Sequence, residues 1–168
     1  MRAKLIVEGR EFPIEIQDPE LKKLLTPKKS TGYGRVAVGD TYYFVSSIGD
    51  VMECEESGLP TDNISYDVAN YYQNELIAEN NARADKLMRQ LRRFAVEHRE
   101  KSLDWNDELT PKHYIMYSHK DGELSTNLGY RCNAFGSINF DTVETAELAI
   151  KTFHDELVWY FTEYKDSL

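Results

Sequence analysis

Hydrophobic and polar residues along the chain are arranged as short strand-like segments and longer helical stripes. Residues Ala3–Glu8 and Glu11–Ile16 are rich in β-forming side chains and flank Gly9-Arg10, so they predict a β-hairpin. A short helix is expected next, because Asp18 is a favourable N-cap and Pro19 suits the first helical position. Its apolar stripe would consist of Leu21, Leu24 and Leu25 before Pro27 ends it.

A second hairpin is predicted where the strand pattern returns. Thr41–Val45 and Val51–Glu55 flank a turn at Ile48-Gly49-Asp50. We expect a loop around Ser57–Asn63 and then an aromatic, strand-like segment, Tyr66–Tyr72.

A long amphipathic helix is predicted from near Asn74 to about Arg99. Its apolar residues recur at spacings of three and four, which places them on one face: Ala84, Leu87, Met88, Leu91, Phe94, Ala95 and His98. Basic residues fall mostly on the opposite face and form a ridge: Arg83, Lys86, Arg89 and Arg93. A solvated helix surface is the simplest interpretation of that ridge.

The last third of the chain repeats the same order of elements. Strands are expected at His113–Ser118, Glu123–Leu128 and Asn133–Phe140, and a helix after Asp141. Asp141 and Glu144 have the spacing of a capping box. The buried stripe of this helix would be Ala146, Ala149, Ile150, Phe153, Leu157, Phe161 and Tyr164.

The two halves can be aligned on each other. Placing Asn74–Glu79 over Thr142–Glu147 also brings Tyr72 onto Phe140, so both halves read as hairpin, aromatic strand and helix. The sequence therefore predicts an α+β fold in which antiparallel hairpins pack against two amphipathic helices, with an internal ββ(β)α duplication. Residues 1–39 would add an N-terminal hairpin and short helix to a 40–168 core with repeat-like units 40–101 and 113–165, and we expect one compact domain.

Composition indicates an ordinary folded chain of 168 residues. Hydrophobic residues make up 41% and aromatic residues 12%, the net charge is -9, and the mean hydropathy is -0.58. Neither a signal-peptide core nor a membrane span is recognisable, so a cytoplasmic location and no membrane association are expected.

No sequence motif indicates a catalytic, metal or cofactor site. His98, His113, His119 and His154 are scattered, and Cys54 and Cys132 lack the spacing of a metal or redox pair. Glycine patterns for dinucleotides and nucleophile elbows are also missing. We therefore expect no cofactor, no metal and no catalytic residue, and a binding protein rather than an enzyme.

Charges are sorted into blocks along the sequence. Between Arg35 and Arg83 there is no lysine or arginine, whereas the interval holds nine carboxylates: Asp40, Asp50, Glu53, Glu55, Glu56, Asp62, Asp67, Glu75 and Glu79. The basic helix follows at once. Such sorting is typical of a protein whose partner has a strong electrostatic field of its own, although the acidic and basic blocks could instead pair with each other.

Several segments carry a resemblance to a known family. They are Tyr42–Val51, Tyr66–Tyr72, Leu91–Ala95, Leu103–Asp107 and Tyr114–Tyr117. Together they resemble a family of uncharacterised accessory proteins of phages and prophages of Gram-positive bacteria, over most of residues 40–164. The resemblance supplies no catalytic residues. It implies a small phage protein that acts in the cytoplasm of a bacterial host cell, on host machinery or on nucleic acid.

Inhibition of a host enzyme is the function that these observations favour. Spaced carboxylates can imitate phosphates in a basic channel, so the chain would act as an acidic DNA mimic, a counter-defence inhibitor of a nucleic-acid-handling enzyme such as a CRISPR nuclease. Exposed tyrosines would anchor the interface. The expected contact residues are Tyr42, Asp50, Glu53, Glu55, Glu56, Asp62, Tyr66 and Asp67.

Two alternatives remain. The basic face of the helix at 83–101, with Arg83, Lys86, Arg89 and Arg93, could bind nucleic acid directly, although the net charge of -9 opposes this. Alternatively, aromatic side chains and a cation such as Arg93 or Arg131 could sequester a nucleotide immune signal.

Overall fold

The computed structural model describes the chain except for residues 1, 8–9, 21–30, 131–135 and 165–168. It divides between Gly34 and Arg35 into two units, Met1–Gly34 and Arg35–Leu168. This division falls a few residues before the boundary drawn from the sequence, because Arg35 and Val36 bond to residues of the second unit.

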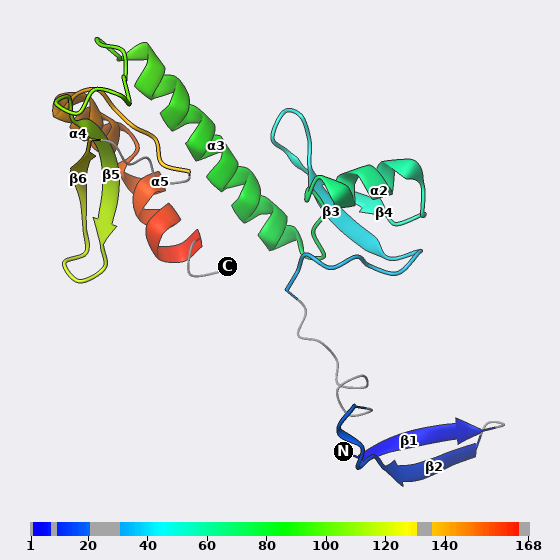
Figure 1. The fold of residues 1–168 in the computed structure, drawn as a ribbon. Helices are drawn as coiled ribbons and strands as arrows, with labels where there is room; N and C mark the ends of the chain where they lie inside the picture. Colours follow the sequence, from blue (N-terminus) through cyan, green and yellow to red (C-terminus); the bar gives the residue numbers. More distant parts are fainter. Residues whose placement is uncertain (1, 8–9, 21–30, 131–135, 165–168) are drawn as a thin grey trace. The chain divides into compact units, whose positions relative to one another are not determined.

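The first unit contains the predicted N-terminal hairpin. Strand β1 (Arg2–Val7) pairs antiparallel with β2 (Arg10–Glu15), with Leu5 opposite Phe12 (Figure 1). The Asp18 carboxylate accepts a hydrogen bond of 2.8 Å from the Glu20 N–H, as expected of an N-cap, and a helix begins at Pro19. The leucine stripe predicted for this helix lies outside the described residues.

The second hairpin is also confirmed. Strand β3 (Thr41–Val45) pairs antiparallel with β4 (Val51–Glu55). Tyr72 forms an isolated antiparallel bridge to Tyr43, in which each N–H donates to the other carbonyl over 2.8 Å.

The segment between β4 and Tyr72 differs from the prediction. Helix α2 (Pro60–Asp67) occupies most of the expected loop and the start of the expected aromatic strand, so both expectations are wrong there. Helix formation is favoured by Pro60 in the first turn and by Asp62, whose carboxylate accepts from the Leu59 N–H. Of the predicted strand Tyr66–Tyr72, Tyr72 alone forms a β-bridge.

The long helix follows the prediction closely. Helix α3 (Glu75–Glu97) begins at Asn74, whose side-chain oxygen accepts from the N–H groups of Leu76 and Ile77. Its buried stripe is Ala78, Ala82, Ala84, Leu87, Leu91, Phe94 and Ala95. Met88 is half-buried and His98 is exposed, so the predicted stripe holds at most of its positions.

A third hairpin is formed by β5 (Lys112–Ser118) and β6 (Glu123–Gly129). His113 bridges to Phe140 as Tyr43 bridges to Tyr72. Residues 136–139 are not in a strand, and the beginning of the predicted strand Asn133–Phe140 lies outside the described residues. Within the described chain, the three hairpins are separate two-stranded sheets.

The C-terminal helical segment is divided into three pieces. Helix α4 (Val143–Thr152) is followed by α5 (His154–Trp159) and by the π-helix η1 (Tyr160–Tyr164). The N-cap of α4 is Thr142, which accepts from the Thr145 N–H, rather than the predicted Asp141. Asp141 instead accepts from the N–H groups of Glu100 and Lys101, so it holds the chain just beyond α3.

The two halves share one local plan, as their alignment predicted. In each, the first strand of a hairpin bridges to a buried aromatic residue, and two residues later an N-cap opens a helix; the pairs are Tyr72 with Asn74 and Phe140 with Thr142. Helix α3 contacts β3 and β4 as well as α4 and η1. The core lies around α3 and α4 and consists of Leu87, Leu91, Phe94, Ala95, Phe140, Ala146, Ala149 and Leu157.

Candidate functional site

The acidic block of the sequence forms one local module, residues 36–82, which contains β3, β4, α2 and the start of α3. Seven of its nine carboxylates are exposed: Asp40, Asp50, Glu53, Glu55, Asp67, Glu75 and Glu79. The other two, Glu56 and Asp62, are 1% and 2% exposed. The module thus presents a field of one sign, and two of its acids have a different role.

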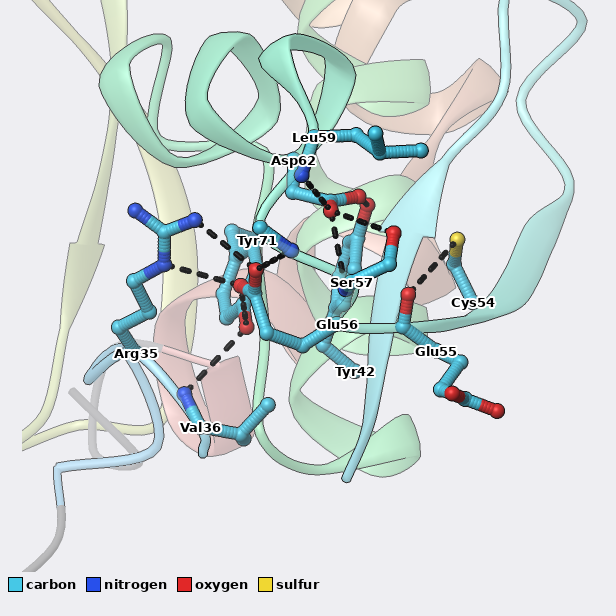
Figure 2. A network of polar contacts seen from close by, with 11 residues as sticks. Arg35, Val36, Tyr42, Cys54, Glu55, Glu56, Ser57, Leu59, Asp62 and Tyr71 are labelled. Atoms are coloured by element: carbon cyan, nitrogen blue, oxygen red, sulfur yellow. Dashed lines mark hydrogen bonds and ion pairs between the residues drawn. The ribbon is translucent and has the colours of Figure 1, made fainter. Parts of the chain in front are cut away.

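Glu56 is the centre of a buried polar network (Figure 2). Its two carboxylate oxygens each accept one hydrogen bond of 2.9 Å from the guanidinium of Arg35, and Tyr71 donates a third bond of 2.9 Å. The Gly58 N–H donates a fourth. The Arg35 guanidinium, followed by the Tyr71 hydroxyl, holds the pKa of Glu56 below its usual value. The charged carboxylate is therefore satisfied by Arg35, just before the module, and by Tyr71 and Gly58 within it.

Asp62 forms the second half of the network. Burial by itself would raise the pKa of Asp62, but the N–H groups of Ser57 and Leu59 outweigh it, and the pKa is lowered. The Ser57 and Tyr42 hydroxyls also donate to this carboxylate. Burial raises the pKa of Tyr42, and the ring of Tyr42 stacks on that of Tyr71 with centroids 4.0 Å apart.

These contacts correct part of the predicted interface. Tyr42, Glu56 and Asp62 were expected to face a partner, and that expectation is wrong, because all three are buried and bonded within the module. They shape the hairpin and α2 instead. Arg35 could have signalled this, since it is the last cation before a long anionic stretch and the obvious ion-pair donor.

The remaining predicted contact residues are on the surface. Asp50 lies in the β3–β4 turn, Glu53 and Glu55 lie on β4, and Asp67 ends α2; all four are exposed. Tyr66 is 40% exposed, although its ring packs edge-on against Tyr71. Their role in partner binding stays a prediction.

The basic alternative face is partly engaged within the fold. Arg83 forms an ion pair with Glu156 of α5, with an N–O distance of 2.8 Å, and so ties α3 to the C-terminal helices. Arg93 lies 3.9 Å from Glu97 one turn along α3. Lys86 and Arg89 are exposed. Two of the four cations of the predicted ridge, Arg83 and Arg93, therefore lie close to carboxylates of the same fold.

A cavity of about 400 Å³ lies between α3, β5 and η1. Its walls are mainly apolar and aromatic: Met88, Leu91, Tyr114, Ile115, Gly136, Ser137, Ile138, Phe140, Tyr160 and Phe161. Burial, and then the charge of Asp85, raises the pKa of Tyr160. Sequence reasoning did not find this cavity, since its wall combines residues that lie far apart in sequence, from Met88 to Phe161.

Neither a metal-binding cluster nor a membrane-spanning helix is found among the described residues. No group of three or more His, Cys, Asp and Glu side chains among them is placed to hold a metal ion. No helix in the described part of the chain is long and apolar enough to cross a bilayer. Cys54 is a free thiol, while Cys132 and Arg131 lie outside the described residues.

Comparison with known proteins gave no match among family models, curated proteins or solved structures.

Proposed function

We propose that the chain is a binding protein whose acidic module blocks a basic surface of a host nucleic-acid-handling enzyme. The module comprises residues 36–82, and its contact residues would be Asp50, Glu53, Glu55, Asp67 and Tyr66. We further propose that this activity serves counter-defence, with a CRISPR nuclease as the type of target, as the resemblance to accessory phage proteins implies. In that setting the module acts as a DNA mimic.

One observation carries the proposal: the module's surface charge is not neutralised by the cations that flank it in sequence. Arg35 is bound to Glu56, and Arg83 is bound to Glu156. Seven carboxylates remain exposed in a stretch without a single lysine or arginine. A concentrated field of this kind steers a basic partner and rejects nucleic acid.

The buried carboxylates Glu56 and Asp62 support the proposal by making the acidic module rigid. A mimic must hold its charges in fixed positions, because each mobile side chain loses entropy on binding. Glu56 and Asp62 fix the end of β4 and the start of α2 through hydrogen bonds to backbone and side chains. The exposed carboxylates of β4 and α2 are thus carried on elements braced from inside.

Charge reversal tests this function. Inhibition of DNA cleavage by a purified CRISPR nuclease would be measured at two salt concentrations for the wild-type chain and for E53K/E55K/D67K. The matched control is E123K/E147K/E163K, which changes the net charge equally at exposed sites elsewhere. We expect inhibition that weakens with salt, is lost in the first variant and is kept in the control. Equal behaviour of the two variants would overturn the proposal.

A second candidate function rests on the cavity near η1. Its volume of about 400 Å³ lies in the range of small-molecule sites, and its aromatic walls suit a nucleobase. Sequestration of a nucleotide signal would appear as an increase in Tm with cyclic or linear nucleotides. The variant Ile138→Trp, which fills the cavity, should abolish that increase. An unchanged Tm across the panel would remove this candidate.

A further inference from the structure

The outer edge of strand β3 is already occupied. Tyr43 exchanges both of its backbone hydrogen bonds with Tyr72, each over 2.8 Å. At Val45, the N–H donates to the Asn70 side-chain oxygen and the carbonyl accepts from the Asn70 side-chain nitrogen, each over 2.8 Å. Tyr43 and Val45 therefore direct their backbone groups away from β4.

This direction fixes the pattern of the whole β3–β4 ladder. In an antiparallel pair, both backbone groups of one residue point to the same side, and neighbouring residues alternate. Tyr43 faces Glu53 and Val45 faces Val51, so these are the pairs without mutual hydrogen bonds. The backbone hydrogen bonds at the two ends agree with this alternation. The Ser46 N–H donates to the backbone carbonyl of Asp50, and the Glu56 N–H donates to the backbone carbonyl of Asp40.

The outer edge of β4 is consequently a row of outward-pointing backbone groups. They belong to Val51, Glu53 and Glu55, whose N–H and C=O groups point away from β3. Within the described part of the chain, the contact recorded for them is a weak one of 3.7 Å from the Cys54 thiol to the Glu55 carbonyl. Such an edge is a template for another strand.

The side chains along this edge select which strand can pair. Glu53 and Glu55 are exposed and lie on the same face of β4, about 7 Å apart by the rise of a strand. An acidic or neutral segment gains nothing from them, and a second copy of this chain would bring glutamates close together. A segment with lysine or arginine at alternate positions would place its cations beside both.

We propose that β4 is a strand-addition site for an extended basic segment of the partner. The backbone edge would supply affinity, and Glu53 with Glu55 would supply the selection for alternating cations. This inference rests on the proposed function, because it specifies how the acidic module recognises its target. It adds a requirement that a diffuse acidic surface lacks: the partner's segment must be extended and must have its amides available.

A peptide experiment tests the edge directly. The probe is a short synthetic peptide that alternates lysine with valine, added to the full chain while backbone amide exchange is followed by NMR. We expect the Val51, Glu53 and Glu55 amides to become protected, and an N-methylated version of the peptide to lose the effect with the protein unchanged. Binding without protection of these amides, or equal binding of the N-methylated peptide, would overturn strand addition.

A matched pair of variants separates charge from backbone. Glu53→Gln and Glu53→Pro both remove one charge, and the proline also removes the outward N–H, a position where an edge strand tolerates proline. We expect affinity for the peptide to fall about twofold to fivefold in Glu53→Gln. In Glu53→Pro it should fall about tenfold or more. A dispersed NMR spectrum of Glu53→Pro confirms that the hairpin is retained, and equal affinities of the two variants would overturn the proposal.

The same pair distinguishes this inference from the function on which it rests. If Glu53→Pro and Glu53→Gln inhibit the nuclease equally while E53K/E55K/D67K does not inhibit it, the acidic module is the site and strand addition is wrong. If the triple variant still inhibits, the proposed function fails whatever the peptide does. Amide protection that appears at high protein concentration without peptide would assign the edge to a second copy and overturn the inference.

Discussion

The guanidinium of Arg83 lies over the ring of Trp159, 3.9 Å from its centroid, while the same group binds Glu156. Helix α3 is thereby joined to α5 by one side chain that makes a cation–π contact and an ion pair. The Tyr164 hydroxyl adds a bond of 3.1 Å to the side-chain oxygen of Asn81, two residues earlier on α3. These contacts give a structural reason for a cation that charge sorting alone would assign to a nucleic-acid face.

Replacing Arg83 should therefore reduce stability. We expect Arg83→Ala to lower the free energy of unfolding by about 1 kcal/mol, the sum of a partly exposed cation–π contact and an exposed ion pair. Arg89→Ala, at an exposed position of the same helix, should change it by less than about 0.5 kcal/mol. Urea denaturation of both variants measures the difference. Equal effects would mean that the contact with Trp159 contributes nothing.

The acidic limb of the stability profile should depend on Glu56. The pKa of Glu56 is lowered in the folded state, so its contribution to stability is present above the unfolded-state pKa of about 4.3 and is lost as pH falls through the lower, folded-state pKa. Asp62 contributes with the same sign. We expect the urea concentration at the unfolding midpoint to decrease as the pH is lowered below about 4, and to decrease less steeply with pH in Glu56→Gln. Glu53→Gln, at an exposed position, should keep the wild-type slope.

Tyr71 should titrate late at alkaline pH. Burial, followed by the bond to Glu56, raises its pKa to about 12. Since the unfolded-state value is about 10, Tyr71 contributes stability that is full below about pH 10 and is lost as pH rises through the folded-state value. Ultraviolet absorbance of the phenolate should show a late phase that shrinks in Tyr71→Phe. A variant with the late phase intact would place the raised pKa elsewhere.

Phe140 should be among the most sensitive core positions. It is 1% exposed, belongs to the core cluster and bridges to His113. Phe140→Ala should cost about 3–5 kcal/mol through lost burial and the cavity that remains. Ile48→Ala provides the control, because Ile48 is 83% exposed and should give a near-zero change. Thermal or urea unfolding of the two variants decides the matter.

Local patterns were sufficient for the hairpins and for the start of α3. Alternation around Gly49, and the Asn74 cap before an apolar stripe, act over a few residues and are readable in one sequence. Helix α2 was missed although Pro60 and Asp62 signalled an N-terminus, because the aromatic residues around Tyr66 gave a competing strand pattern. The interruption at Phe153 has no glycine or proline to announce it.

The candidate site was harder to predict because burial of a charge depends on distant partners. Glu56 and Glu55 are adjacent and chemically alike, yet Glu55 is exposed while Glu56 is enclosed by Arg35 and Tyr71, which lie 21 and 15 residues away in sequence. Alternation along β4 does not contain this information. The same holds for the cavity, whose wall joins Leu91 to Phe161.

Helix α3 has a consequence for how the second unit responds to binding. It contacts β3 in the acidic half and α4 and η1 in the other half, so neither half can unfold without exposing part of the same helix. The two halves should then open together rather than one at a time. A partner bound at the acidic half would therefore slow hydrogen exchange in α4 and η1 as well. Binding at one half of the second unit would be measurable in the other half.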